Sequence, residues 1–202
     1  MEVLSFLQKY ILGILLITAV VLSGCDTEEP DIVNVPETIT DVKLLFTNDS
    51  DASDVVEARA EDPDGDGVEE LQILDEIVLG VDKTYTLTYE ILNDLASPPE
   101  DIGAEILEED NEHQVFFSFT EGAFADPTGN GNIDNAADPI NYNDSDENNR
   151  PVGLSTTWTT GSSEVTGTFT AKLQHQPDQK TDNSTATTGD TDFDLQFVLK
   201  IQ

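Results

Sequence analysis

Apolar and polar positions alternate with a period of two along most of the chain from residue 39 onward. The alternation is clearest in the segments 84–91, 165–173 and 192–201. Such a pattern predicts strands with one buried face. Further strand candidates lie near 41–47, 54–61, 69–79, 113–120 and 152–160. About eight short strands joined by turn-rich segments predict a mainly β domain, a single antiparallel β-sandwich (Ig-like or jelly-roll-like) over residues 39–202.

One segment interrupts the alternation with a helical pattern. Residues 97–100 read Ser-Pro-Pro-Glu, which has the spacing of a capping box with proline at the first helical position. Ile102, Ile106 and Leu107 would then share one face of the helix, which is predicted to end near Asn111.

Two long segments show neither pattern. Residues 122–151 have no strand periodicity and are rich in Asp, Asn and Gly, and a second polar stretch covers 176–190. Long loops inside compact domains are usually functional or disordered. Both segments are therefore places to look for binding residues.

The N-terminal residues predict where the protein is located in the cell. Ile11 to Leu22 form a twelve-residue apolar run, which is shorter than the roughly 20 residues that span a bilayer and fits the apolar region of a secretory signal. Leu22-Ser23-Gly24-Cys25 follows it and resembles the lipobox of bacterial lipoproteins. That resemblance implies a signal peptide over 1–24, cleavage before Cys25, and diacylglycerol and acyl chains such as palmitate on Cys25. The alternative is an ordinary signal peptide or signal anchor with an incidental cysteine.

An acidic tether is predicted over residues 25–38. Asp26, Glu28 and Glu29 directly follow the cysteine and resemble the surface-export signal of Bacteroidota lipoproteins. The resemblance implies an outer-membrane protein, lipid-anchored and exposed on the cell surface. The alternative is that these acids merely begin a solvated linker.

Charge narrows the possible partners. The sequence has 42 acidic residues against 8 lysines and arginines, a formal net charge of −34, which excludes nucleic acid as a partner. The single cysteine excludes an intrachain disulfide and a multi-cysteine zinc site. There is no G-x-S-x-G, no Gly-Lys dipeptide and no H-E-x-x-H, so the sequence does not predict an enzyme.

Two acidic segments are candidate calcium sites. The first resembles an EF-hand loop and offers Asp126, Thr128, Asn130 and Asp134, with Asp138 one place beyond the position where the bidentate Glu is expected. The second repeats the opening of that pattern with Asp62, Asp64 and Asp66. Calcium requires six to eight oxygen ligands, and the alternative is ordinary Asp-Gly turn chemistry.

The only two histidines form a second candidate metal site. His113 leads the alternation of residues 115–119, and His175 continues the alternation of 165–173, so both are predicted to face inward at strand ends. If the strands pair, the imidazoles converge, and a carboxylate from Glu112 or Asp178 would complete a site for zinc or copper that is lost below about pH 6. The alternative is that each histidine caps the core and bonds locally.

Several short motifs in order resemble a known group of proteins. They are the segments 62–67 (DPDGDG), 84–85 (TY), 92–93 (LN), 112–117 (EHQVFF), 175–177 (HQP) and 189–192 (GDTD). Together they are similar to small Bacteroidota surface lipoproteins that are often labelled a type 1 periplasmic-binding-fold superfamily and regarded as receptor-associated. That label implies an α/β fold, whereas the periodicity of this chain favours β.

These observations predict a surface-exposed outer-membrane lipoprotein that binds a small ligand or metal. Its predicted partners are the membrane, through the lipidated N-terminus, and a TonB-dependent outer-membrane receptor. The alternative is a structural or adhesive surface module with calcium-braced loops.

Overall fold

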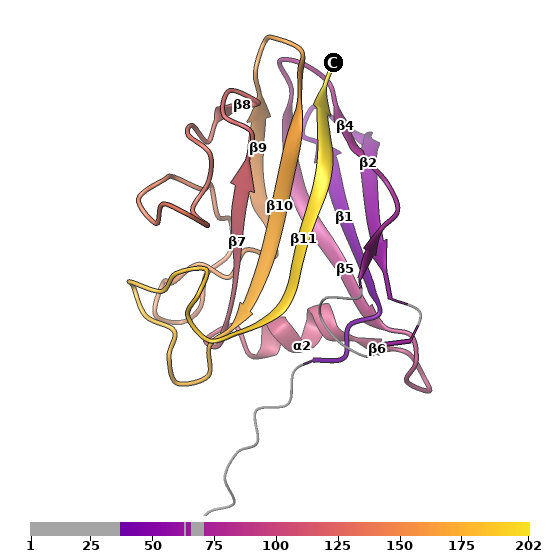
Figure 1. Ribbon diagram of the computed structural model, residues 1–202, viewed down its shortest axis with the longest axis vertical. Coiled ribbons are helices and arrows are strands. Elements are labelled where there is room, and N and C mark those ends of the chain that lie inside the picture. Colours follow the sequence, from indigo (N-terminus) through magenta and orange to yellow (C-terminus); the bar gives the residue numbers. More distant parts are fainter. Residues whose placement is uncertain (1–36, 63, 66–70) are drawn as a thin grey trace, which may run out of the picture. The chain divides into compact units, whose positions relative to one another are not determined.

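Two facing β-sheets make up the domain (Figure 1). The computed structural model describes residues 37–62, 64–65 and 71–202. Sheet A contains β1 (Asp41–Asn48), β2 (Asp51–Glu61), β3 (Gln72–Ile73), β5 (Thr84–Asn93), β6 (Glu100–Asp101), β8 (Phe124–Asp126) and β9 (Thr156–Thr160). Sheet B contains β4 (Ile77–Leu79), β7 (His113–Phe119), β10 (Val165–His175) and β11 (Asp190–Ile201). The strand orders are β3-β2-β1-β5-β9-β8, with β6 against β5, and β4-β11-β10-β7.

The hydrophobic core lies between the sheets because the alternating residues of each sheet turn inward. In β1, every second side chain is buried, and this strand is paired antiparallel with β2 and β5 on its two sides. Aromatic rings join the layers. Phe169 of sheet B lies 5.6 Å from Phe46 and 5.0 Å from Trp158 of sheet A, measured between ring centroids. Each fully buried ring of this kind contributes about 1.5–3 kcal/mol. The predicted mainly β, sandwich-like fold is confirmed.

The strand expected over 69–79 is wrong as a single element. In its place β3 pairs with β2 in sheet A, and β4 pairs with β11 in sheet B. The chain leaves sheet A after Leu74, whose N–H bonds to Arg59 O, while Asp75 accepts the Arg59 Nε–H at 2.8 Å. The β4–β11 pair is parallel, so the sandwich is not antiparallel throughout.

The helix begins later than the capping-box pattern predicts. The helix α2 covers Ile102–Glu108, so it also ends before Asn111. Asp101 is its N-cap, and the Asp101 side chain accepts a hydrogen bond from Ala104 N–H at 3.1 Å. The expected start at 97–100 is wrong because residues 100–101 pair with β5 instead. Ile102 and Ile106 are buried as expected, but Leu107 is 57% exposed, so it does not share their face.

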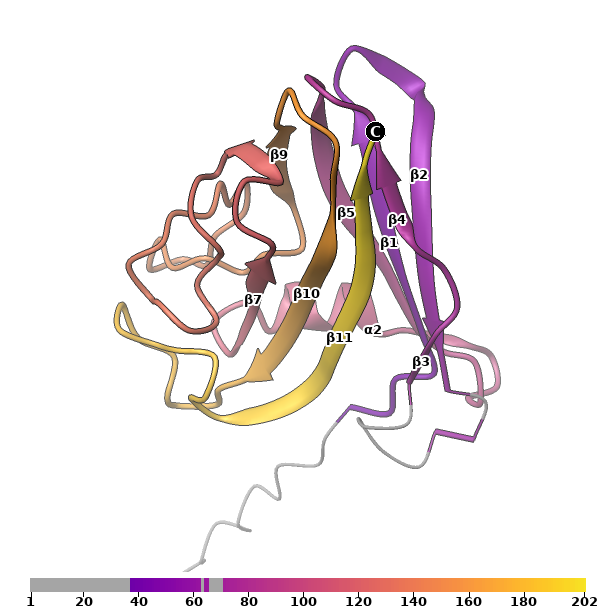
Figure 2. The same cartoon turned by 45° about the horizontal axis from the view of Figure 1, so that its top comes forward.

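The long segment 122–151 covers the free edge of β7. It holds the short strand β8, which its sequence did not predict, and Phe119 N–H bonds to Asn130 O while Ile133 N–H bonds to Phe117 O. A Cβ at Gly131 would lie 2.2 Å from Phe117 O, so only glycine allows this close approach. An unpaired edge is thereby capped. Figure 2 shows this segment and the loop 176–189 on the side of β7.

Other predictions meet the structure only in part. The strand expected over 152–160 begins only at Thr156. The residues before it bond to the covering loop; for example, Ser155 O accepts a hydrogen bond from Asn143 N–H.

The predicted signal peptide, Cys25, the export residues and most of the tether lie outside the described residues. In the part of the chain that the structure describes, no helix has the length and apolar character needed to cross a bilayer.

Candidate metal centre

The two histidines meet at the end of sheet B that lies beside α2. His113 of β7 is the register partner of His175 of β10. Gln176 N–H donates to Glu112 O at 2.6 Å in the next pair, so the histidines occupy a position where side chains approach closely. Their rings are stacked, with centroids 4.4 Å apart and planes 4° from parallel.

His113 is oriented by the end of the helix. Its Nδ1 lies 3.1 Å from Glu109 O, and because a carbonyl only accepts, Nδ1 carries the proton and Nε2 keeps its lone pair. The side chain is fully buried. Burial, with smaller contributions from His175 and Lys180, lowers the pKa of His113 to about 4, although the bond to Glu109 O acts the other way. The ring is therefore neutral at neutral pH, which is the form that binds metals.

A carboxylate that the sequence analysis did not single out faces this lone pair. Leu173 pairs with Phe193 and Gln174 with Thr191, so Asp192 lies between as the extra residue of a β-bulge. The alternation predicted Asp192 on the outer face, but its side chain is fully buried, with Oδ2 3.9 Å from His113 Nε2. Neither carboxylate oxygen has a hydrogen-bond partner in the part of the chain that the structure describes. Burial, and then the charges of Glu37 and Asp190, raise the pKa of Asp192 to about 7.

His175 has more freedom than His113. Its Nε2 lies 3.5 Å from Glu112 Oε2, and neither ring nitrogen has a hydrogen-bond partner among the described residues. One ligand atom each of Glu109, His113 and His175 lies within 4.8 Å of the others. We refer to Glu109, Glu112, His113, His175 and Asp192 as the histidine cluster.

The surroundings of the histidine cluster are acidic. Burial and the charges of Glu105 and Glu109 raise the pKa of Glu37 nearby. The buried Lys180 pairs with residues outside the histidine cluster. Its Nζ donates to Asp110 O at 2.6 Å and lies 3.4 Å from Asp146 Oδ2. Within the described residues, no lysine or arginine forms a salt bridge with a carboxylate of the cluster. The cluster therefore combines a neutral His113 with carboxyl groups that no lysine or arginine among the described residues pairs with.

Of the two carboxylates considered from the sequence, only Glu112 lies in the cluster. Asp178 is exposed, in a turn with a φ of 57°.

The candidate calcium residues are held mainly by turn hydrogen bonds. Asp138 accepts from Asn130 N–H at 3.1 Å and from Asn135 Nδ2 at 2.7 Å, and Asn130 Nδ2 lies 3.3 Å from Asp134 Oδ2. Asp126 and Thr128 are exposed. Among the described residues, the only three histidines or acids whose ligand atoms all lie within 4.8 Å are Glu109, His113 and His175, so Asp126, Asp134 and Asp138 do not converge on one point.

The second calcium candidate is also a turn. Asp62 Oδ1 accepts the N–H groups of Asp64 and Gly65 at 3.1 and 3.0 Å. Asp66 lies outside the described residues. Calcium binding at either segment stays a prediction.

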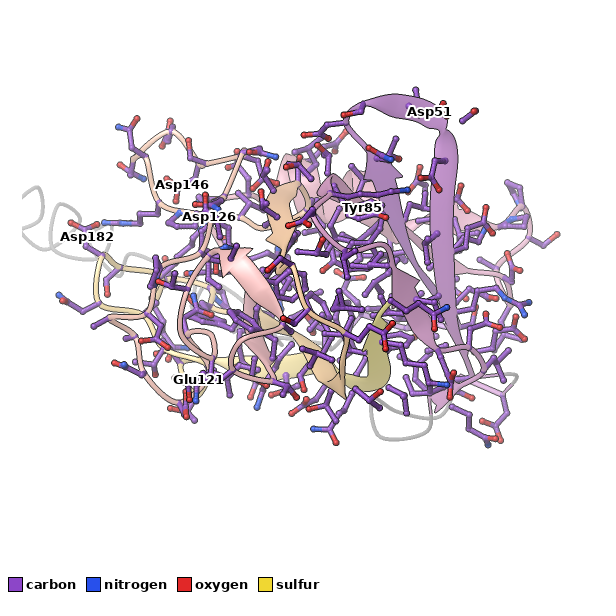
Figure 3. The ribbon with its side chains drawn as sticks, turned by 90° about the horizontal axis from the view of Figure 1, so that it is seen from above. Asp51, Tyr85, Glu121, Asp126, Asp146 and Asp182 are labelled. Atoms are coloured by element: carbon purple, nitrogen blue, oxygen red, sulfur yellow. The ribbon has the colours of Figure 1, made fainter. Side chains whose placement is uncertain are left out.

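A cavity of about 470 Å³ lies where the two long loops cover β7. Its lining includes Gln114, Phe116, Tyr142, Asp182 and Asn183. Another lining residue, Asn132, already uses its amide, since Oδ1 accepts from Phe117 N–H and Nδ2 donates to the Tyr142 hydroxyl. Figure 3 labels Asp126, Asp146 and Asp182 on this side of the domain, away from Asp51 in the β1–β2 hairpin. The cavity is large enough for a small ligand but contains no fully buried unpaired charge.

Comparisons of the chain with protein-family models, with curated proteins and with solved structures found no match.

Proposed function

We propose that this protein is a surface-exposed lipoprotein of the bacterial outer membrane whose β-sandwich domain binds a metal ion at the histidine cluster. In this proposal Cys25 carries the lipid, the acidic residues after it direct surface export, and the domain works with a TonB-dependent outer-membrane receptor. The lipobox resemblance at residues 22–25 supports the anchor.

One observation carries the metal-binding part: a buried pair of imidazoles and a buried carboxylate have unpartnered polar atoms. Polar atoms of His113, His175 and Asp192 are buried and have no hydrogen-bond partner within residues 37–62, 64–65 and 71–202. Almost all buried polar groups in proteins have such partners, because an unpaired group costs about 1–3 kcal/mol. A bound cation would supply the missing partner to several of these groups at once.

The test is metal binding by the full chain, expressed with its own signal and purified in detergent after chelator treatment. We expect about one equivalent of zinc or copper per chain by elemental analysis after desalting. His113→Ala and His175→Ala should each weaken binding, and the double variant should abolish it. Glu121→Gln, in an exposed turn of the same domain, is the matched control. A double variant that holds both metals as tightly as the parent refutes the site.

The anchor has its own test. Cys25→Ser should abolish incorporation of labelled palmitate and release the protein from the membrane fraction. Replacing Asp26, Glu28 and Glu29 with Ala should leave labelling intact but remove the protein from protease attack on whole cells. If the parent is not labelled, the lipoprotein assignment fails. A protein that is anchored, binds calcium and binds no transition metal would instead be the structural or adhesive module.

A further inference from the structure

The approach of His113 to Asp192 has no explanation in the hydrogen bonds of the described residues. Nε2 lies 3.9 Å from Oδ2, both side chains are fully buried, and neither atom has a hydrogen-bond partner among the described residues. Two acceptors facing each other repel unless a positive centre lies between them. Zinc binds nitrogen and carboxylate oxygen at about 2.0–2.2 Å each, so an ion between these two atoms reaches both with little movement of either side chain.

We propose that Asp192 is a metal ligand and that the site takes a divalent ion of intermediate softness, zinc(II) or copper(II). The first two ligands are His113 Nε2 and Asp192 Oδ2, which lie 3.9 Å apart. Among the described residues, Asp192 does not lie within 4.8 Å of both His113 and either Glu109 or His175, so these two would complete the site only after a side chain moves. The proposal rests on the proposed function.

The chemistry of this ligand set favours one class of ion. Two imidazoles suit zinc and copper better than calcium or magnesium. The sequence holds one cysteine and one methionine, at positions 25 and 1, so the domain that bears the cluster has no sulfur ligand for copper(I). Two carboxylates neutralise a divalent ion, which matters because an uncompensated charge in the interior is very costly.

Binding requires one ring to turn. The lone pairs of stacked rings lie in parallel planes that are offset from each other, so they cannot both aim at one ion. His113 is held by Glu109 O, whereas His175 has no hydrogen-bond partner among the described residues and is the ring able to rotate. Glu112 Oε2, 3.5 Å from His175 Nε2, is placed to accept a hydrogen bond from Nε2–H, which would leave the lone pair of Nδ1 for the ion.

The deciding variant is Asp192→Asn in the full chain, with Asp194→Asn as control. Asp194 lies two residues along the same strand, and its side chain is 53% exposed. Titrations with zinc(II), copper(II), copper(I) and calcium separate the ion classes, and cobalt(II) absorption reports the ligand geometry. We expect Asp192→Asn to weaken zinc(II) binding at least about 100-fold and Asp194→Asn to change it less than twofold. In the parent, zinc(II) and copper(II) should bind far more tightly than copper(I) or calcium.

The outcomes separate the two proposals. If the double histidine variant loses the metal but Asp192→Asn binds like the parent, Asp192 is not a ligand and only this inference fails. If the parent binds none of the ions, the proposed function fails as well. Should Asp192→Asn not fold, Asp192→Glu keeps the charge and moves the carboxylate by one methylene. An unchanged affinity and cobalt(II) spectrum in that variant overturn the assignment.

Discussion

The domain buries two aspartates in opposite ways. Asp146, in the segment that covers β7, accepts the N–H groups of Asn148 and Arg150 at 2.8 Å each, and Lys180 Nζ lies 3.4 Å from its second oxygen. Asp192, in the histidine cluster, accepts no hydrogen bond from the described residues, and its Oδ2 lies 3.9 Å from His113 Nε2. Both side chains are fully inaccessible to solvent.

The pKa values of the two carboxyls follow from this contrast. Burial alone would raise the pKa of Asp146, but the N–H donors and Lys180 outweigh burial and lower it. No donor offsets burial at Asp192, and its pKa rises to about 7. Two carboxyls that are equally buried therefore differ in pKa because one has hydrogen-bond donors and the other has none among the described residues.

The largest expected effect is that of removing the paired carboxylate. Asp146→Ala leaves the buried Lys180 ammonium without its counter-charge and two N–H groups without their acceptor, which should cost about 3–5 kcal/mol of unfolding free energy, measured by urea denaturation. The control is Asp182→Ala, because the Asp182 side chain is 82% exposed in its pair with Arg150. That variant should cost less than about 1 kcal/mol. Equal losses in the two variants would contradict the structural role of Asp146.

Removing the carboxylate of Asp192 should change the free energy of unfolding in the opposite direction. In chelator at pH 8, Asp192→Asn takes away a buried charge that has no donor, so we expect the free energy of unfolding to rise by about 1–3 kcal/mol. Asp194→Asn should leave the free energy unchanged within about 0.5 kcal/mol. A destabilisation by Asp192→Asn as large as that of Asp146→Ala would mean that Asp192 is structural.

A third prediction tests how the covering segment is tied to β7 at high pH. The Tyr142 hydroxyl donates to Val115 O at 2.8 Å, and burial raises its pKa to about 12, above its ordinary value of 10. The unfolded chain therefore loses this proton first, so the contribution of Tyr142 to stability is complete below pH 10 and declines as the pH rises from 10 to 12. Tyr142→Phe should cost about 1 kcal/mol at pH 8 and show a smaller alkaline decline. An identical decline in both proteins would refute this.

The smallest expected effect is that of calcium on the same segment. Calcium would have to displace bonds such as that from Asn135 Nδ2 to Asp138. We expect binding no tighter than about millimolar, as in the weakest calcium modules, with little change in melting temperature. Calorimetry on chelator-treated protein measures this, and Asp138→Asn should remove any heat. A micromolar dissociation constant would show that the loop rearranges into a true calcium site.

The fold could be predicted because the period-two pattern directly reports which face of a strand is buried. The start of the helix was predicted wrongly because local hydrogen bonds hold the preceding residues in an extended conformation. The bond from Asn93 Nδ2 to Glu100 Oε2, with the pairing of residues 100–101 to β5, delays the helix to Asp101. The passage of residues 72–79 from one sheet to the other has no signal in the alternation, because both strands keep the same apolar phase.

The site could be predicted only as far as the strands are regular. The shared inward phase of His113 and His175 follows from alternation, and their pairing needed only that β7 and β10 be neighbours. Asp192 could not be found in this way, because the bulge reverses its side without leaving a mark in the apolar pattern. The one available signal was that Asp192 is the last residue of the motif 189–192. The alternation, however, predicted that its side chain lies on the outer face of the strand.

The bulge in β11 also has a genetic meaning. On either side of Asp192 the ladder with β10 is in regular register, Leu173 with Phe193 and Gln174 with Thr191. An in-frame deletion of that one codon would therefore close the ladder and leave the pairing of the other β11 residues unchanged, while removing the buried carboxylate. The loss of a single triplet at this point would therefore be sufficient to erase Asp192 from the histidine cluster without disturbing the sheet around it.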